Sequence, residues 1–370
     1  MAQGLLGELT PSVFLRRHWQ RQPLFVAGAM AGCGEWIRPE LLFDLAARDD
    51  VESRLVMRAR GRWTVQSGPF PRRQWSRMPA RGWTLLVQGV EQHCAQGADL
   101  LQQFSFIPHA RLDDLMVSYA PHGAGVGPHF DSYDVFLLQG MGTRRWRISA
   151  QKDLALVEHA PLRVLKHFRH TQEWIAHQGD LLYLPPQFAH EGVAMEPCMT
   201  LSVGFRAPRH QELASGFLDY LQDALHIDGI YQDRDLTLQH HPACLSPAML
   251  KKFSTILNGL RWNEKTILAF SGRYLSEPKA QTQFEPPRRA LSYAAFCKRV
   301  ADKGVRLASA SRLLFSGSAF FINGECCTCR GADRKTLIRL ADHRCILGFT
   351  PTDDTASLLY TWYRAGYIEC

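Results

Sequence analysis

Two histidines and one aspartate have the residue types and spacing of a metal site. His129 and Asp131 are two residues apart in the glycine-rich segment 123–133, and His190 follows 59 residues after Asp131. Side chains two apart on an extended strand point the same way, so one strand end supplies two ligands and a distant segment the third. Two imidazoles and one carboxylate form the facial triad that holds Fe(II), with three positions left for a bidentate co-substrate and dioxygen.

The residues around His190 separate this pattern from a chance match, which a chain with 15 histidines can produce. Residues 180–184 read Asp-Leu-Leu-Tyr-Leu, which is typical of a buried strand. Pro185 and Pro186 then end the strand pairing, because proline has no N–H. His190 follows on a short turn, before a second apolar strand at 199–205. Strand, turn, histidine and strand in this order predict a double-stranded β-helix.

These segments resemble the JmjC-type 2-oxoglutarate oxygenases, and among them the bacterial ribosomal oxygenases. The matching stretches include Gly-Val-Gly-Pro-His-Phe-Asp-Ser-Tyr and Pro-Pro-Gln-Phe-Ala-His-Glu-Gly, and they lie at 14–25, 111–118, 125–136, 139–146, 185–192 and 202–208. The resemblance implies a protein hydroxylase that uses Fe(II), the co-substrate 2-oxoglutarate and O2. It also implies an arginine of large-subunit ribosomal protein sixteen as the target, whereas eukaryotic relatives modify histidines of other ribosomal proteins.

The distal carboxylate of 2-oxoglutarate needs a cation, and the planar fork of an arginine suits it. The resemblance places this cation at Arg144, on the strand after the His-x-Asp segment. The rival is Arg206, which follows the distal histidine, where many other oxygenases of this kind carry their arginine. Ser118 and Ser202 could add hydroxyl groups to the same carboxylate, or could be buried hydroxyls that the backbone satisfies.

An arginine target needs an acidic group and an aromatic wall beside the iron. Tyr133, two residues after Asp131, can face the same cavity, and Asp114 on the strand before the glycine-rich segment can supply the charge. Asp113 points the opposite way if Asp114 points inward. The glycines within 123–127 allow a close backbone approach or form a flexible turn.

The chain of 370 residues is too long for a single core, and its pattern changes twice. Residues 1–208 carry all the metal motifs and predict the catalytic jelly roll. Residues 209–278 show amphipathic helices with large apolar stripes, for which the resemblance implies homodimerisation. Residues 279–370 mix helices and short strands and resemble a small winged-helix-like domain. The expected fold class is therefore α+β.

No apolar run of 18 or more residues and no secretory leader pattern occur, so we expect a cytoplasmic protein without membrane spans. The ten cysteines lack the spacing of a disulfide scaffold and are expected to be reduced. Cys326, Cys327 and Cys329 form the one cluster, with His343 and Cys345 as weakly spaced partners for zinc. Bystander thiols are the alternative.

The net charge is +8, and the last quarter of the chain is mildly basic. This excess is compatible with contact to RNA and equally with a solvated face, so direct nucleic-acid contact stays open. The competing functions are a JmjC demethylase, for which no aromatic methyl-lysine cage is visible, and a non-catalytic cupin-like metal protein. A non-catalytic cupin-like metal protein would leave Arg144 unexplained.

Overall fold

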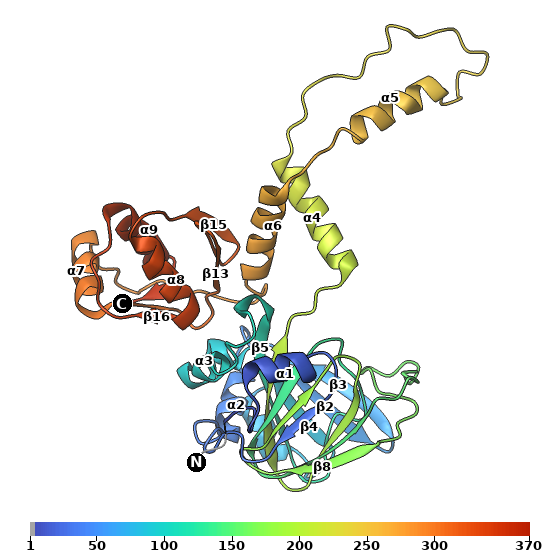
Figure 1. The fold of residues 1–370 in the computed structure, drawn as a ribbon. Coiled ribbons are helices and arrows are strands. Elements are labelled where there is room, and N and C mark those ends of the chain that lie inside the picture. The colour runs from blue at the N-terminus through green and yellow to red at the C-terminus, as the bar shows by residue number, and fades with distance from the viewer. Residues whose placement is uncertain (1–3) are drawn as a thin grey trace.

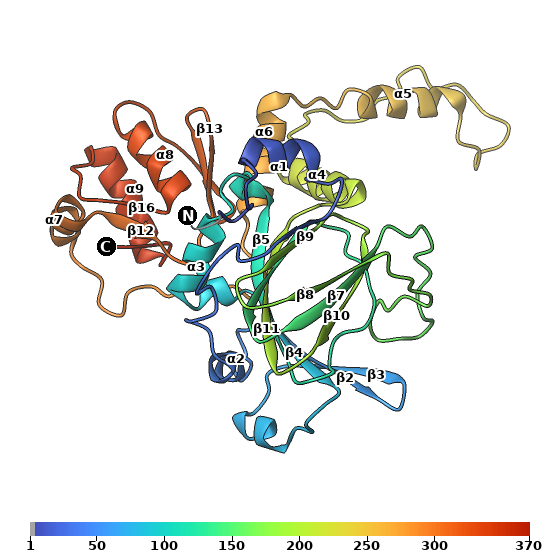
Figure 2. The same cartoon turned by 60° about the horizontal axis from the view of Figure 1, so that its bottom comes forward.

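The computed structural model describes residues 4–370, which form a barrel, a projecting helical arm and a small C-terminal domain (Figure 1). A turned view shows the barrel strands wrapping around one interior, with the C-terminal domain beside α3 (Figure 2). No helix among these residues is long and apolar enough to span a membrane.

The barrel is built mainly on an eight-stranded sheet with the order β1-β9-β6-β11-β5-β4-β2-β3. Its central strand is β11, whose residues are all buried because β5 and β6 flank it and other layers cover both of its faces. Such a strand reads as a continuous apolar run in the sequence. The strands are β1 Leu24–Val26, β2 Ser53–Ala59, β3 Arg62–Ser67, β4 Trp83–Val87, β5 Leu112–Ala120, β6 Val135–Met141, β9 Leu181–Leu184 and β11 Cys198–Phe205.

A second sheet of three strands, in the order β10-β7-β8, closes the jelly roll. The strands are β7 Arg144–Ser149, β8 Gln172–Ala176 and β10 Ala189–Ala194. In β7 the residues alternate, with Arg144, Trp146 and Ile148 buried and the intervening arginines more exposed. The predicted double-stranded β-helix is confirmed, and β7 turns Arg144 toward its interior.

The outer face of the large sheet packs against N-terminal helices and turns. Thr10 caps the first helix by accepting a hydrogen bond from the backbone N–H of Val13. Buried aromatic rings join the helices to the sheet, with Phe14 5.0 Å from Tyr183 and Phe104 4.9 Å from Phe136. The elements are α1 Pro11–Arg17, α2 Pro39–Leu45, η1 Arg72–Arg77, η2 Val90–Gln92, α3 Ala95–Gln102 and η3 His109–Arg111.

The arm consists of α4 His210–Ala224, α5 Pro247–Leu257 and α6 Glu264–Ser276. Helices α4 and α6 pack through Phe217 and Phe270, whose rings lie 5.3 Å apart. Helix α5 projects away from the rest of the molecule (Figure 1). None of the residues of α5 is buried, although its sequence is amphipathic.

The C-terminal domain has its own core, in which Phe296, Leu337, Leu359 and Trp362 are buried. The mixture of helices and short strands expected for residues 279–370 is present, and it includes three helices. The elements are α7 Tyr293–Lys303, β12 Val305–Leu307, β13 Leu313–Ser316, β14 Ala319–Ile322, β15 Glu325–Thr328, α8 Asp333–His343, β16 Cys345–Ile346, α9 Asp353–Arg364 and β17 Ile368–Glu369.

Candidate active site

The structure brings His129, Asp131 and His190 together at one end of the barrel. One ligand atom from each lies within 4.8 Å of the others, and in residues 4–370 no other group of His, Cys, Asp and Glu meets this criterion. The backbones of His129 and His190 exchange two hydrogen bonds, of 2.9 and 2.7 Å. This short bridge holds the two imidazoles side by side, with ring centroids 4.2 Å apart.

Both imidazoles are oriented by backbone carbonyl groups. The Nδ1 atom of His129 lies 2.9 Å from the carbonyl oxygen of Gly127, and that of His190 lies 2.9 Å from the carbonyl oxygen of Phe188. A carbonyl can only accept, so each Nδ1 carries the proton and each Nε2 lone pair is available to a metal. Burial, and next the nearby His129, lower the pKa of His190 to about 4, so its ring is neutral near pH 7.

The loop that carries Asp131 is held from two sides. The backbone N–H of Gln187 donates to the carbonyl of Asp131 at 2.7 Å, which ties the loop to the turn after β9. At the start of β6, the buried carboxylate of Asp134 accepts from the hydroxyl of Tyr183 at 2.6 Å and from the amide of Gln20 at 2.9 Å. The Asp131 carboxylate is thereby placed 3.7 Å from Nε2 of His190.

Two glycines allow the layers around the triad to approach closely. A Cβ at Gly125 would lie 2.3 Å from the carbonyl oxygen of Gly192, and a Cβ at Gly192 would lie 2.6 Å from the ring of Trp146. The indole of Trp146 therefore occupies space beside the triad, with its centroid 6.1 Å from that of His190. Close approach, rather than a flexible turn, explains the glycine at 125.

Arg144 lies deeper in the barrel, beyond Trp146. Its guanidinium carbon lies 5.6 Å from the Trp146 ring centroid, and its Nε lies 3.5 Å from the sulfur of Cys198. The Nη2 nitrogen is buried and has no hydrogen-bond partner among the described residues. A buried cationic donor without a partner is costly, and an anion placed there would offset the cost.

Arg206, Ser118 and Ser202 were also considered for the co-substrate, and the structure places Arg206 apart from the two serines. Arg206 donates to the carbonyl of Leu275 at 3.1 Å and pairs with Asp113, so its guanidinium is engaged outside the barrel interior. Ser118 and Ser202 are buried, and both alternate with residues of the outer core, so they share the interior face. This arrangement favours Arg144 over Arg206.

The residues present fit a metal ion and a dicarboxylate. His129, Asp131 and His190 are the donor set that suits Fe(II), and they occupy one face of the site. Nη2 of Arg144 is an unsatisfied donor on the same interior face. A co-substrate with one chelating end and one carboxylate end matches these two features.

Asp114 and Tyr133 meet over Gly204 at the open side of the barrel. A Cβ at Gly204 would lie 3.7 Å from Oδ1 of Asp114 and 3.9 Å from the ring of Tyr133. Asp114 is buried, whereas Tyr133 is 41% exposed. Burial first, and then the charges of Asp131 and Asp114, raise the pKa of the Tyr133 phenol, which therefore keeps its proton at neutral pH.

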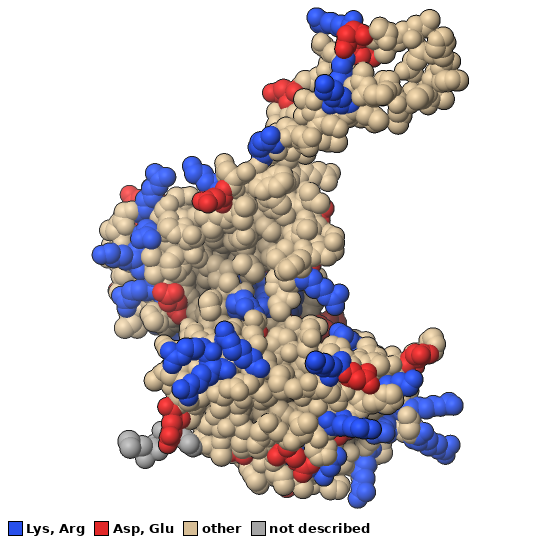
Figure 3. Space-filling model, turned by 45° about the vertical axis from the view of Figure 1, so that its right-hand side comes forward, with Lys and Arg blue, Asp and Glu red and all other residues tan. Residues whose placement is uncertain are grey.

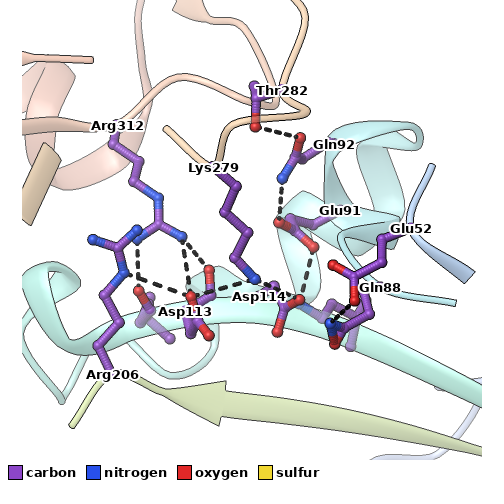
Figure 4. Close-up of polar contacts among 12 residues, drawn as sticks. Glu52, Gln88, Glu91, Gln92, Asp113, Asp114, Arg206, Lys279, Thr282 and Arg312 are labelled. Atoms are coloured by element: carbon purple, nitrogen blue, oxygen red, sulfur yellow. Dashed lines mark hydrogen bonds and ion pairs between the residues drawn. The ribbon is translucent and has the colours of Figure 1, made fainter. Parts of the chain in front are cut away.

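An ionic cluster that was not expected from the sequence lies behind Asp114 (Figure 4). Lys279, from the segment after α6, donates to Oδ2 of Asp114 at 2.9 Å and lies 3.4 Å from Asp113. Arg312 of the C-terminal domain donates to the carbonyl of Leu112 at 2.9 Å. Burial raises the pKa of Asp114, and the Lys279 ammonium opposes that rise. Lys279 thus favours the ionised carboxylate and occupies only one of its oxygens.

The cysteine cluster does not form a metal site in the described chain. Cys326 is exposed and Cys329 is buried, and neither belongs to a group of potential ligands. Both positions flank or lie in β15, where neighbouring residues alternate in direction. Bystander thiols are the interpretation that the geometry favours.

Two family models match the chain, a JmjC domain over residues 99–213 and a ROXA-like winged helix over residues 259–369. The chain is 37% identical over 277 residues to the ribosomal protein uL16 3-hydroxylase of Escherichia coli, covering 74% of this chain and 73% of that protein. It is 23% identical to a Drosophila persimilis protein named bifunctional lysine-specific demethylase and histidyl-hydroxylase NO66, over 57% of this chain and 32% of that protein.

A solved structure of YcfD, a ribosomal oxygenase from Escherichia coli, in complex with cobalt and 2-oxoglutarate has the same fold. It superimposes with a TM-score of 0.84 at 31% identity, covering 98% of both chains. The agreement extends over the barrel, the arm and the C-terminal domain, which confirms the fold expected from the sequence.

Proposed function

Since the chain belongs to the JmjC-domain ribosomal oxygenases and is a 2-oxoglutarate-dependent dioxygenase, we propose that it hydroxylates an arginine of a large-subunit ribosomal protein. One observation carries the choice of arginine. Asp114 presents its Oδ1 oxygen beside the exposed ring of Tyr133, while Lys279 binds only its Oδ2 oxygen. A carboxylate oxygen next to an aromatic face suits a guanidinium, which forms directional hydrogen bonds and stacks on rings.

Each part of the site then has one task. His129, Asp131 and His190 hold the iron, which with 2-oxoglutarate and dioxygen supplies the oxidation that places an oxygen atom on the substrate. Arg144 binds the distal carboxylate of the co-substrate, and Ser118 and Ser202 line the same interior face. Tyr133 and Asp114 orient the target side chain at the open end, and the Trp146 ring keeps water from the space between the two ends.

Histidine is the competing target, because the NO66 relative is named a histidyl-hydroxylase. A neutral imidazole gains less from an ionised carboxylate than a guanidinium does, since a charge-assisted hydrogen bond is about twice as strong as a neutral one. Burial raises the pKa of Asp114 and the Lys279 ammonium opposes this rise, which favours the ionised form of the carboxylate that a guanidinium would bind.

The test is a competition between two peptides. Purified protein with Fe(II) and 2-oxoglutarate is offered an arginine peptide of ribosomal protein uL16 and a histidine peptide of another ribosomal protein. We expect the mass of one oxygen atom to be added to the arginine peptide only, and no addition when that arginine is replaced by alanine. Preferential modification of the histidine peptide would overturn the arginine assignment.

We also infer that the arm is covered by a second copy of the chain. Large apolar side chains on α4, α5 and α6 are exposed, namely Leu218, Phe253, Ile256, Leu257, Ile267 and Leu268. An apolar surface of this extent on a monomer is an association liability. Sedimentation at micromolar concentration should give a homodimer, and replacing Ile256 and Leu257 with aspartate should give a monomer. A monomeric wild-type protein would contradict this inference.

A cytoplasmic location follows from the proposed substrate.

A further inference from the structure

The positive charge of the protein is concentrated in one part of the barrel. Residues 53–90 contain eight arginines and no Asp, Glu or Lys. Outside this segment the remaining 35 basic residues balance the 35 acidic ones. The whole net charge of +8 therefore corresponds to a stretch of 38 residues that crosses β2, β3, η1 and β4.

Four of these arginines gather at the β2–β3 hairpin, and we call Arg58, Arg60, Arg62 and Arg81 the arginine tip. The hairpin reverses through Arg60 and Gly61, whose φ angles are 49° and 77°. The backbone N–H of Arg58 donates to the carbonyl of Gly82 at 2.8 Å, which brings Arg81 to the same end.

The side chains of the arginine tip are directed to solvent. All four residues are exposed, and none forms an ion pair with an acidic side chain of residues 4–370. Figure 3 shows basic side chains standing out from the lower, barrel-containing half of the molecule. Like charges held together repel one another, and an anionic partner would relieve this repulsion.

The arginine tip adjoins the candidate active site. The guanidinium of Arg58 lies 5.0 Å from the ring centroid of Trp63. That ring packs on the backbone of Gly127, where a Cβ would lie 2.7 Å from it, and the carbonyl of Gly127 accepts from His129. Phe130 belongs to the same loop as Gly127 and His129, and its ring centroid lies 4.7 Å from the guanidinium carbon of Arg163. Cations thus flank the loop that carries two metal ligands.

We propose that the arginine tip is an RNA-binding surface, which holds the RNA that accompanies the protein substrate while the substrate side chain enters the barrel. The choice of RNA rests on the proposed function, because ribosomal proteins are made to bind RNA. Arginine is suited to the role, since its planar fork pairs with phosphate oxygens. An acidic protein segment is the alternative partner, and it is less suited to a row of arginines that protrudes on a narrow hairpin.

The experiment measures binding of a short fluorescein-labelled RNA hairpin by anisotropy, with full-length protein and without iron or 2-oxoglutarate. The variant R58Q/R60Q/R62Q is compared with K298Q/R299Q/K303Q, which removes three exposed positive charges from α7. We expect the first variant to bind about tenfold more weakly and to lower the slope of log K against log salt by about 2 to 3. The α7 variant should bind like the wild type, and R58K/R60K/R62K should retain most of the affinity.

Three results would overturn the proposal. These are an absence of RNA binding by the wild type, a loss of binding in the α7 variant but not in the hairpin variant, and equal binding of a polyglutamate peptide of matched charge. Hydroxylation of a free arginine peptide is measured on the same samples. Because RNA binding is assayed without cofactors, its failure and a failure of the proposed hydroxylation are distinguishable.

Discussion

The two ends of the barrel interior are built in different ways. The co-substrate end, around Arg144, is enclosed by residues of the strand ladders, and Nη2 of Arg144 has no hydrogen-bond partner within residues 4–370. At the target end, Tyr133 is exposed and Asp114 is paired with Lys279, 165 residues further along the chain. Under the proposed function, the first end would bind one small anion, whereas the second would receive a side chain of a large partner and is built from residues far apart in the chain.

The metal triad serves both ends, so its removal has the largest expected effect. His129→Ala or Asp131→Ala should reduce both peptide hydroxylation and peptide-independent 2-oxoglutarate turnover to background, because each removes an iron ligand. The fold should survive, since each change only trims a side chain at the cavity. Succinate release and circular dichroism check the two statements, and turnover retained in both variants would refute the triad assignment.

Arg144→Ala should damage the co-substrate end alone. Removing one partner of a buried charge pair costs about 3–5 kcal/mol, which corresponds to roughly two to four orders of magnitude in the 2-oxoglutarate requirement. The KM for the peptide should change little. The matched control is Arg206→Ala, and if this variant rather than Arg144→Ala raises the 2-oxoglutarate requirement, the anchor lies elsewhere.

Asp114→Asn should damage the target end alone. Loss of a hydrogen bond to a charged group costs about 1.5–3 kcal/mol, so peptide kcat/KM should fall roughly 10- to 150-fold. Peptide-independent turnover should fall far less. Lys279→Met should raise the peptide KM by a smaller factor, and Lys279→Arg should restore it. Equal losses with and without peptide would mean that the two ends are not separable.

The smallest expected effect concerns Glu91, which is buried behind Asp114 and whose titration changes the stability of the fold with pH. Burial, and next the charge of Asp114, raise its pKa from 4.5 to about 7. The folded chain then holds a proton that the unfolded chain releases, so this group's contribution to stability is full below pH 4.5 and is lost as pH rises toward about 7.

Glu91→Gln should reduce the slope of the free energy of unfolding against pH by at most about 1.4 kcal/mol per pH unit, because one proton is involved. Glutamine keeps an oxygen that can accept from the N–H of Leu115, as Glu91 does at 2.9 Å. Urea unfolding across the pH range provides the measurement. An unchanged slope in the variant would assign the pH dependence to other groups.

What could be predicted from the sequence follows the same division between the two ends. His129, Asp131 and His190 lie on or beside strands, where alternation and turn residues carry the information, and the structure brings one ligand atom of each within 4.8 Å of the others. The role of Arg144, deeper in the barrel, stays a prediction. The structure places Asp114 and Tyr133 beside Gly204, and their role toward a substrate side chain stays a prediction. Lys279 could not be found, because no local pattern reports a contact between a linker and a strand so far away.

In the C-terminal domain, helix α9 was missed although its buried residues follow one helical stripe: Thr355, Ala356, Leu359, Trp362 and Tyr363. The helix contacts α7 and β17. The arginine tip was also overlooked, because a whole-chain charge of +8 does not reveal that one segment lacks acidic residues.

The pairing of Asp114 has a consequence for the order of events during synthesis. Its partner Lys279 is translated 165 residues later, and Arg312 reaches the same strand from 199 residues beyond Asp113. Until Lys279 has left the ribosome, the Asp114 carboxylate lacks the ammonium group that binds it, although Arg206 is already available to pair with Asp113. The target end of the barrel is therefore completed among the last steps of folding, well after the metal ligands have been made.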